Sequence, residues 1–235
     1  MNCVKLATGA SEAEVESRLS ALRFPEKMCA FFFRSERKKP RRKIRSEVSS
    51  MLREMFPGVR IAYYDEGIAA LLPLQEEIST PGAAAEKLRP LAEKERLSIG
   101  LSDPFTDPAS FRVFFLQARR ALELLGKGPD AGTVSLYESV CFEDLLSAVT
   151  DRTALLRFRH PALDILQKYD EENGTDYSKT LQVFLDCGRN IKLAAEALFI
   201  HRNTMIYRLA RIQSPTQADL EDADARFRLE ASFRI

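Results

Sequence analysis

Apolar residues recur along the first 150 positions with two different periods. Short apolar runs bounded by charged residues predict β-strands, which are residues 28–33, 60–64, 68–72, 97–101 and 133–137. Apolar residues spaced three or four apart predict amphipathic helices, which are residues 11–22, 40–56, 81–94, 109–125 and 142–149. Pro104 and Pro108 predict a loop after the fourth strand. This order of elements predicts an α/β sandwich with helices against a mostly antiparallel sheet.

From about His160 onward the strand pattern is lost, and the chain has the pattern of short helices separated by polar turns. The fold class that follows is α+β, with an α/β sandwich followed by an all-α domain. The change of period predicts two domains, at residues 1–155 and 156–235, and the first of them includes the N-terminal helix.

The start of the second domain carries clear helix signals. The pairs His160-Pro161 and Asn173-Gly174 are typical of the beginning and end of one helix. Thr175 or Asp176 is then predicted to cap a second helix, which ends at Gly188.

Residues 190–213 have the pattern of two helices joined by a tight turn. Asn190 is placed to cap a helix at residues 191–198, and a turn at residues 199–201 leads into a helix at residues 202–213. Ala194 and Ala195 are small enough to let the second helix cross the first closely. The arrangement predicts a helix-turn-helix.

The helix at residues 202–213 has an apolar side and a polar side. Met205, Leu209 and Ile212 are spaced i, i+4, i+7 and are predicted to face the core, so the polar side chains between them are predicted to point outward. Arginine can bind guanine edges and asparagine can bind adenine edges in the major groove. The predicted DNA-binding residues are Asn190, Lys192, His201, Arg202, Asn203, Thr204, Tyr207, Arg208 and Arg211.

Two of these residues have a second interpretation that the sequence leaves open. His201 can serve only as a helix cap, and Tyr207 can serve only to pack against neighbours. Arg208 and Arg211 are expected to contact phosphates rather than bases.

Charge supports a local rather than a global attraction to nucleic acid. The whole chain has a formal net charge of +1. Residues 189–211 carry five basic side chains against Glu196 alone, which favours phosphate binding there. Residues 37–45 contain seven basic side chains in nine positions; these could add DNA or nucleotide contacts, although such a run is more often simply solvated.

Asn190 through Ile212 resembles the C-terminal helix-turn-helix of the PucR/CdaR regulators of purine and sugar-diacid metabolism. The resemblance lies in Ala194-Ala195, Leu198, the run His201-Arg202-Asn203-Thr204 and Arg208-Leu209, with flanking similarity at residues 160–163 and 219–229. It implies a DNA-binding transcriptional regulator of catabolic genes whose second helix enters the major groove. Pro215 and Gln217 stand where the family usually has leucine and glycine, so we expect a different connection to the last helix.

The strand order of the first domain resembles the GGDEF-like, cyclase-related domain that precedes this helix-turn-helix. A cyclase would carry paired glycines before its acids, to admit a nucleotide and hold magnesium. Here the hairpin reads Tyr63-Tyr64-Asp65-Glu66-Gly67, so Asp65 and Glu66 are assigned to a solvated turn. The alternative function, a nucleotide-binding or degenerate cyclase-like signalling protein, is therefore the weaker interpretation.

Other chemistry finds little support in the sequence. The four cysteines lack metal-binding spacing, and His160 and His201 lack the partners of a catalytic site, so we expect no enzyme activity, metal or cofactor. No segment approaches the roughly 20 apolar residues of a membrane span, and Met1–Gly9 is no signal peptide, which favours the cytoplasm.

The expected partners are double-stranded DNA and a second copy of the chain, since such modules usually pair on two half-sites. The resembled family usually has a sensory domain before the GGDEF-like domain, for which this chain has no room. We therefore expect either a shortened chain or an input, such as a small-molecule effector, that arrives through a domain or partner outside it.

Overall fold

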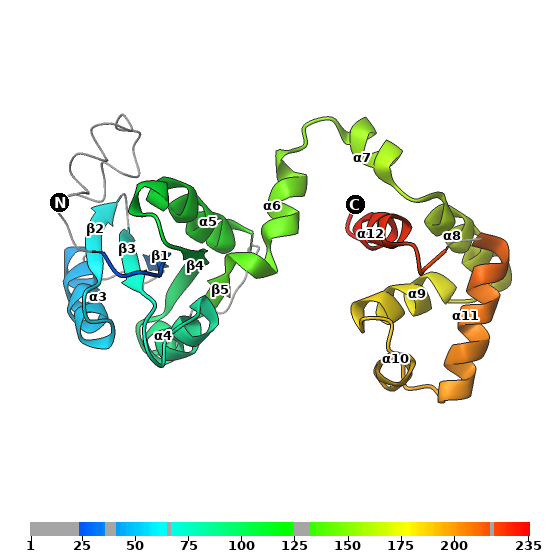
Figure 1. Ribbon diagram of the computed structural model, residues 1–235, viewed down its shortest axis with the longest axis horizontal. Helices are drawn as coiled ribbons and strands as arrows, with labels where there is room; N and C mark the ends of the chain where they lie inside the picture. The colour runs from blue at the N-terminus through cyan, green and yellow to red at the C-terminus, as the bar shows by residue number, and fades with distance from the viewer. Residues whose placement is uncertain (1–23, 36–40, 65–66, 125–131, 217–218) are drawn as a thin grey trace. The chain divides into compact units, whose positions relative to one another are not determined.

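The computed structural model describes residues 24–35, 41–64, 67–124, 132–216 and 219–235 (Figure 1). The chain forms two compact units that divide between Leu145 and Leu146, within helix α6 (Cys141–Ala148). The α+β class is confirmed, whereas a functional domain boundary after residue 155 stays a prediction. The helix predicted at residues 11–22 lies outside the described residues.

The first unit is built on one five-stranded sheet in the order β2-β3-β1-β4-β5. Its strands are β1 (Met28–Ser35), β2 (Arg60–Tyr64), β3 (Gly67–Pro73), β4 (Leu97–Phe105) and β5 (Val134–Leu136). Three neighbouring pairs are antiparallel, and only β4 and β5 run parallel. The predicted mostly antiparallel sheet is confirmed.

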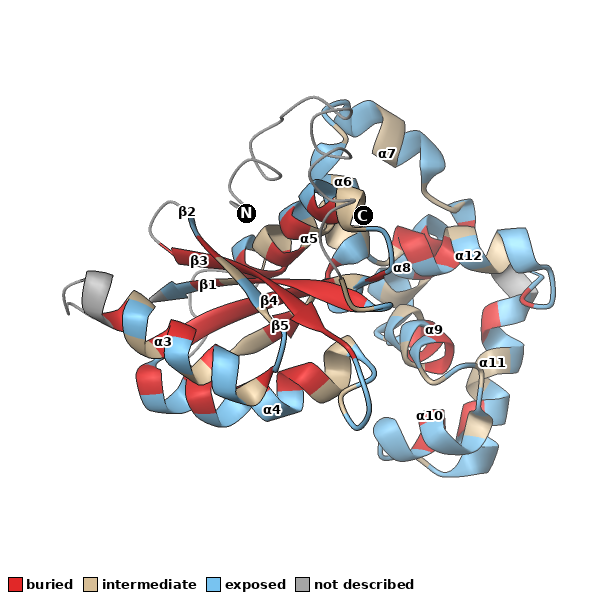
Figure 2. Ribbon diagram, turned by 60° about the vertical axis from the view of Figure 1, so that its left-hand side comes forward, coloured by how far each residue is buried: buried red, intermediate tan, exposed pale blue. Residues whose placement is uncertain are grey.

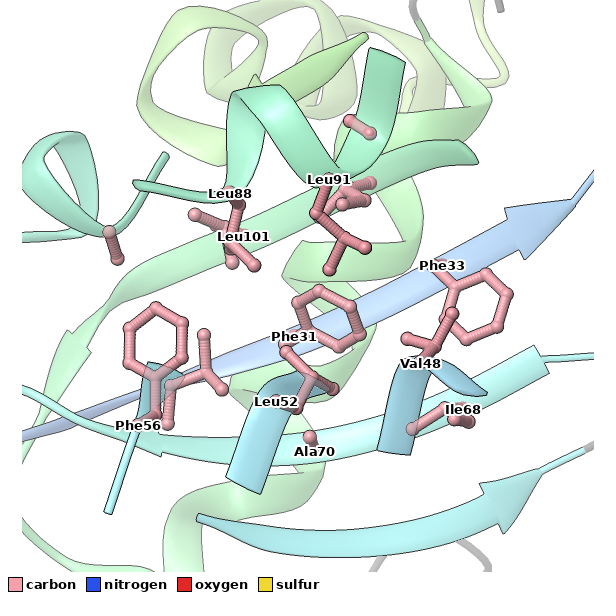
Figure 3. Close-up of a cluster of buried hydrophobic side chains, with 14 of the residues drawn as sticks. Phe31, Phe33, Val48, Leu52, Phe56, Ile68, Ala70, Leu88, Leu91 and Leu101 are labelled. Carbon is pink, nitrogen blue, oxygen red and sulfur yellow. The ribbon is translucent and has the colours of Figure 1, made fainter. Parts of the chain in front are cut away.

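Helices cover both faces of the sheet (Figure 2). One face carries α3 (Arg41–Met55) and α4 (Pro81–Glu95), and the other carries α5 (Phe111–Glu123). Every residue of β3 is buried, because alternate side chains enter two different cores. Ile68, Ala70 and Leu72 pack with α3 and α4 (Figure 3), whereas Ala69 and Leu71 pack with α5.

Strand β4 is longer than the sequence predicts. It continues through Pro104 to Phe105, where a loop is expected, and pairs there with Met28 and Cys29 of β1. A register shift between Cys29 and Phe31 accommodates this extension. At the shift the Ala30 N–H donates to the Ser102 hydroxyl over 2.8 Å, in place of a ladder bond.

The hairpin between β2 and β3 requires glycine at position 67. Tyr64 pairs with Gly67, which leaves a two-residue loop whose Asp65 and Glu66 lie outside the described residues. A Cβ atom added to Gly67 would lie 2.1 Å from the carbonyl oxygen of Phe33. The close approach of the two backbones therefore requires glycine here.

The second unit is all helical. Its helices are α7 (Arg152–Phe158), α8 (Pro161–Asn173), α9 (Tyr177–Asp186), α10 (Ile191–Ala197), α11 (Arg202–Thr216) and α12 (Ala223–Ser232). The sequence pattern misses α7, a two-turn helix with no buried residue that begins because Asp151 accepts a hydrogen bond from the Thr153 N–H. Helix α11 runs three residues beyond its predicted end.

Candidate nucleic-acid interface

Helices α10 and α11 and the turn between them form the predicted helix-turn-helix. Asn190 caps α10 as predicted, since its side-chain oxygen accepts from the N–H groups of Lys192 at 3.0 Å and Leu193 at 3.2 Å. These bonds satisfy two of the backbone donors that the start of a helix leaves unpaired. Because the Asn190 amide is used as a cap, its orientation is fixed from within the protein.

His201 caps α11 in the same way. Its Nδ1 accepts from the Asn203 N–H over 3.2 Å, which confirms the cap interpretation. An accepting Nδ1 carries no proton, so the hydrogen of neutral His201 lies on Nε2 and is available to an outside acceptor. A contact between His201 and DNA stays a prediction.

The apolar side of α11 packs as the spacing predicts. Met205 and Ile212 are buried, Leu209 is partly buried, and all three join the core of the second unit. Ala194 and Ala195 of α10 are buried in the same core, which confirms the close approach of the two helices. The first turn of α11 is thereby held against the domain through one side only.

The opposite side of α11 presents a row of exposed polar residues. Arg202, Asn203 and Thr204 are exposed on the first turn, and Tyr207 and Arg211 are exposed further along. Tyr207 is 59% exposed, and whether it only packs or contacts DNA stays a prediction. These placements agree with the predicted outward face, but they do not by themselves show DNA contact.

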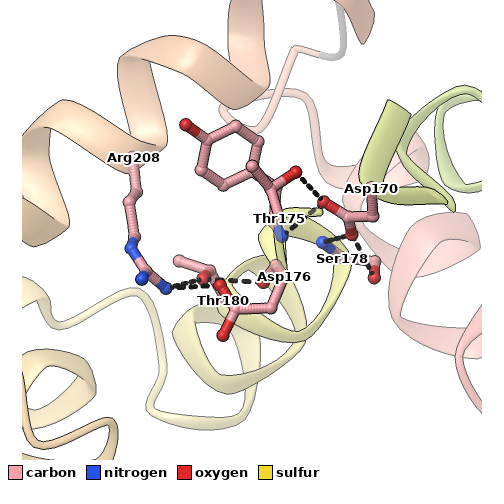
Figure 4. Close-up of polar contacts among 7 residues, drawn as sticks. Asp170, Thr175, Asp176, Ser178, Thr180 and Arg208 are labelled. Atoms are coloured by element: carbon pink, nitrogen blue, oxygen red, sulfur yellow. Dashed lines mark hydrogen bonds and ion pairs between the residues drawn. The ribbon is translucent and has the colours of Figure 1, made fainter. Parts of the chain in front are cut away.

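Arg208 departs from the predicted outward placement. Its Nη1 donates to Asp176 Oδ1 at 2.8 Å and to the Thr180 hydroxyl at 3.0 Å, and its side chain is only 24% exposed (Figure 4). Asp176 directly precedes α9, and Thr180 is a buried residue of its first turn. Arg208 lies at the edge of the apolar stripe, where its long side chain can reach this partner.

The cap of α9 also differs from the prediction. Asp176 makes no capping bond, and the carboxylate of Asp170, on α8, takes that role. It accepts from the N–H groups of Tyr177 at 2.7 Å and Ser178 at 2.8 Å (Figure 4). Sequence reasoning sought the cap next to the helix, whereas the turn at Gly174 folds α8 back so that Asp170 reaches it.

Hydrogen bonds set the charge of Asp170. Burial by itself would raise the pKa of this carboxyl, but hydrogen bonds from Thr175, Ser178 and Tyr177 together lower it below the ordinary value of 3.8. Asp170 is therefore ionised at neutral pH, where a carboxylate accepts these bonds most strongly. Because Asp170 caps α9, the carboxylate of Asp176 is available to bind the Arg208 guanidinium.

The basic residues between 189 and 211 are not equally available. Arg189 is bound to Glu221 at 2.8 Å and Arg208 to Asp176, while Lys192 and Glu196 approach only to 4.0 Å on the surface. Among the described residues, no carboxylate lies within ion-pair distance of Arg202 or Arg211. The unpaired positive charge therefore lies on α11, with Lys192 beside it.

Metal ligands, membrane-spanning helices and cysteine thiols are the remaining features to consider in the described residues. In the described residues no three or more His, Cys, Asp or Glu side chains are placed to hold a metal ion, and no described helix could span a bilayer. Cys29, Cys141 and Cys187 are free, and burial raises the pKa of the Cys29 thiol to about 12. That thiol is inert at neutral pH because the thiolate is the reactive form.

Comparison with known families defines the class of protein. Residues 8–124 match the GGDEF-like domain, and residues 177–235 match the PucR C-terminal helix-turn-helix domain. The first match covers strands β1 to β4 and helices α3 to α5, but not β5, and the second covers α9 to α12. The chain therefore combines a GGDEF-like domain with a PucR-type helix-turn-helix domain. It belongs to the PucR family.

Curated relatives share parts of the chain. The proline-responsive transcriptional activator PutR of Bacillus subtilis is 37% identical over 84 residues, which are 36% of this chain and 20% of PutR. The DNA-binding transcriptional activator AdeR is 30% identical over 74 residues, 32% of this chain and 18% of AdeR. The purine catabolism regulatory protein is 25% identical over 142 residues, 60% of this chain and 26% of the relative; both are also from Bacillus subtilis.

The chain thus aligns with about a quarter or less of the length of these relatives. Among solved structures, a regulator of polyketide synthase expression from Bifidobacterium adolescentis is 20% identical, with 98% of this chain and 93% of that chain covered and a TM-score of 0.45.

Proposed function

We propose that this protein is a sequence-specific DNA-binding regulator of the transcription of catabolic genes, of the sugar-diacid or purine type, and not an enzyme. The observation that carries the proposal is the first turn of α11, where Arg202, Asn203 and Thr204 are exposed on a helix fixed by a cap and a buried apolar side. The curated relatives are named as two transcriptional activators and a catabolism regulator, and these names support the same class of function.

In this proposal the residues nearest the start of α11 contact the base edges. Arg202 and Asn203 carry the side chains that discriminate guanine and adenine edges, and Tyr207 lies one turn further on the same exposed side. Phosphates are bound by Thr204, Arg211, Lys192 and the Nε2–H of His201, and by the amide N–H₂ group of Asn190, whose oxygen caps α10. Arg208 belongs to the scaffold in this scheme.

The GGDEF-like unit supplies input rather than catalysis. Its hairpin lacks the paired glycines that a nucleotide site needs, and Gly67 is explained by backbone packing. We propose that a small-molecule effector or a sensory domain outside this chain acts through it. The protein works on chromosomal DNA in the cytoplasm as a homo-oligomer, because two copies are needed to read two half-sites.

Selection from a pool of random-sequence duplexes tests the proposal. The full chain should enrich one sequence, and Arg202→Ala should weaken binding to it by about 1–3 kcal/mol and relax specificity at one base pair. Arg157→Ala is the matched control, because Arg157 is an exposed arginine of α7, remote in sequence from the interface. Failure to enrich any sequence would contradict DNA recognition, and unchanged affinity in Arg202→Ala would remove Arg202 from the reading surface.

A further inference from the structure

The turn between α10 and α11 contains an exposed aromatic ring in an unfavourable backbone conformation. Phe199 is 96% exposed, more than any other large hydrophobic residue in the described part of the chain. Its φ angle is +54°, in the left-handed region that bulky side chains avoid. Neither feature follows from the packing of the fold.

The backbone around Phe199 forms a standard helix ending that normally uses glycine. The Ile200 N–H donates to the Ala195 carbonyl at 3.0 Å, and the Phe199 N–H donates to the Glu196 carbonyl at 3.1 Å. This pair of bonds is the Schellman motif, whose left-handed position is usually glycine. Phe199 occupies that position.

The same unit uses glycine at its other left-handed helix endings. Gly174 ends α8 with a φ of 62°, and Gly188 follows α9 with a φ of 61°. Among the described non-glycine residues with a positive φ, which are Glu76, Arg96, Arg189 and Phe199, only Phe199 is apolar. A glycine there would relieve strain and bury an equal amount of apolar surface. A ring that costs stability and is 96% exposed points to a partner outside the protein.

The surroundings of Phe199 identify the chemistry of that partner. The turn leads directly into His201, Arg202 and Asn203, the exposed start of α11, and it lies at the opposite end of this unit from α12 in both views (Figures 1 and 2). The exposed positive charge of Arg202 and of Lys192, whose nearest carboxylate lies 4.0 Å away, favours a polyanion beside the ring. Duplex DNA combines such phosphates with apolar surface on its deoxyriboses and thymine methyl groups.

We propose that Phe199 is a DNA-contacting residue whose ring packs against the apolar surface of the duplex, beside the bases that α11 reads. This inference rests on the proposed function and adds an uncharged contact to its polar ones. Since the contact involves no charge, it contributes to affinity without contributing to the salt dependence of binding.

Phe199→Gly gives the sharpest test, because affinity and stability should respond in opposite directions. With the duplex selected by the full wild-type chain, the variant should bind about tenfold more weakly, at every salt concentration, with an unchanged slope of log K against log salt. Its melting temperature should equal or exceed that of the wild type because the strain is removed. Phe199→Asn, which also tolerates the left-handed region, should behave alike, and Phe227→Ala on α12 serves as the control for loss of an exposed ring.

Each result bears on the inference. Binding by Phe199→Gly within twofold of the wild type overturns it while leaving the proposed function intact, and a lowered melting temperature overturns it by showing that the ring packs within the fold. A wild-type chain that selects no duplex contradicts the proposed function itself, and the inference falls with it. With thymine replaced by uracil in the probe, a weakening seen only in the wild type assigns the contact to the methyl group; otherwise the contact is assigned to the deoxyribose.

Discussion

Removal of the Arg208 guanidinium should destabilise the second unit without changing how binding to DNA depends on salt. The perturbation is Arg208→Met, which keeps the aliphatic part of the side chain and removes its charge and hydrogen bonds. Arg208 joins α11 to the start of α9 through Asp176 and the buried Thr180. Because these contacts lie within the second unit, Arg208→Met tests the packing of α11 against α9 and not the DNA-binding surface.

The magnitude follows from the exposure of the partners. Asp176 is 57% exposed and Arg208 is 24% exposed, so the ion pair is largely solvated and contributes about 0.2–1 kcal/mol. The charged hydrogen bond to Thr180, which is fully buried, contributes about 1.5 kcal/mol more. We expect the free energy of unfolding to fall by about 2 kcal/mol in Arg208→Met.

Urea unfolding followed by circular dichroism measures this change, and a double-mutant cycle with Asp176→Asn isolates the pair. The slope of log K against log salt, measured well below the melting temperature, should stay at the wild-type value. Arg211→Met is the matched comparison, since loss of a phosphate contact should reduce that slope by about 0.9. A reduced slope in Arg208→Met with unchanged stability would refute the scaffold assignment.

Two predictions concern pH. Because the folded-state pKa of Asp170 lies below 3.8, its carboxylate stabilises the fold at neutral pH, and this contribution is lost as the pH falls from about 3.8 through the folded pKa. Asp170→Asn should therefore be less stable than the wild type at pH 7 in urea unfolding, and the two should converge in acid; a constant difference would be evidence against the linkage. His160 caps α8 through Nδ1, and burial, followed by the charge of Arg228, lowers its pKa below 6.5. The neutral form thus stabilises the fold above about pH 6.5, and that stability is lost as the pH falls from there through the folded pKa; His160→Asn, an uncharged cap, should lose less stability between pH 7.5 and 5.

Local signals in the sequence were sufficient for most of the fold. The uninterrupted apolar run of β3 is typical of a strand buried on both faces, and the i, i+4, i+7 spacing of Met205, Leu209 and Ile212 reports which side of α11 is buried. Burial is the dominant local constraint in both cases. Asn190 was predictable as a cap because a cap acts on the residues immediately after it.

Three of the errors share one physical cause, which is a partner outside the local element. Pro104 reads as a loop residue, but β1 lies beside it and a bulge at Ala30 absorbs the irregularity. Asp170 is seven residues before the start of the helix that it caps, and Arg208 is 28 residues from Thr180. Tertiary contacts of this kind decide where a polar side chain points, and no local period encodes them.

The same distinction separates the two kinds of residue on α11. A polar residue at the edge of the apolar stripe can reach inside the domain, as Arg208 does, whereas residues at the centre of the opposite side have no such option. Asn203 is of the second kind, whereas Arg202 is exposed because it begins the first turn of α11. Phe199 adds an exposed apolar group directly before this turn. Exposed polar and apolar groups that lie together fit a ligand with both kinds of surface, which is the property that duplex DNA has in its grooves.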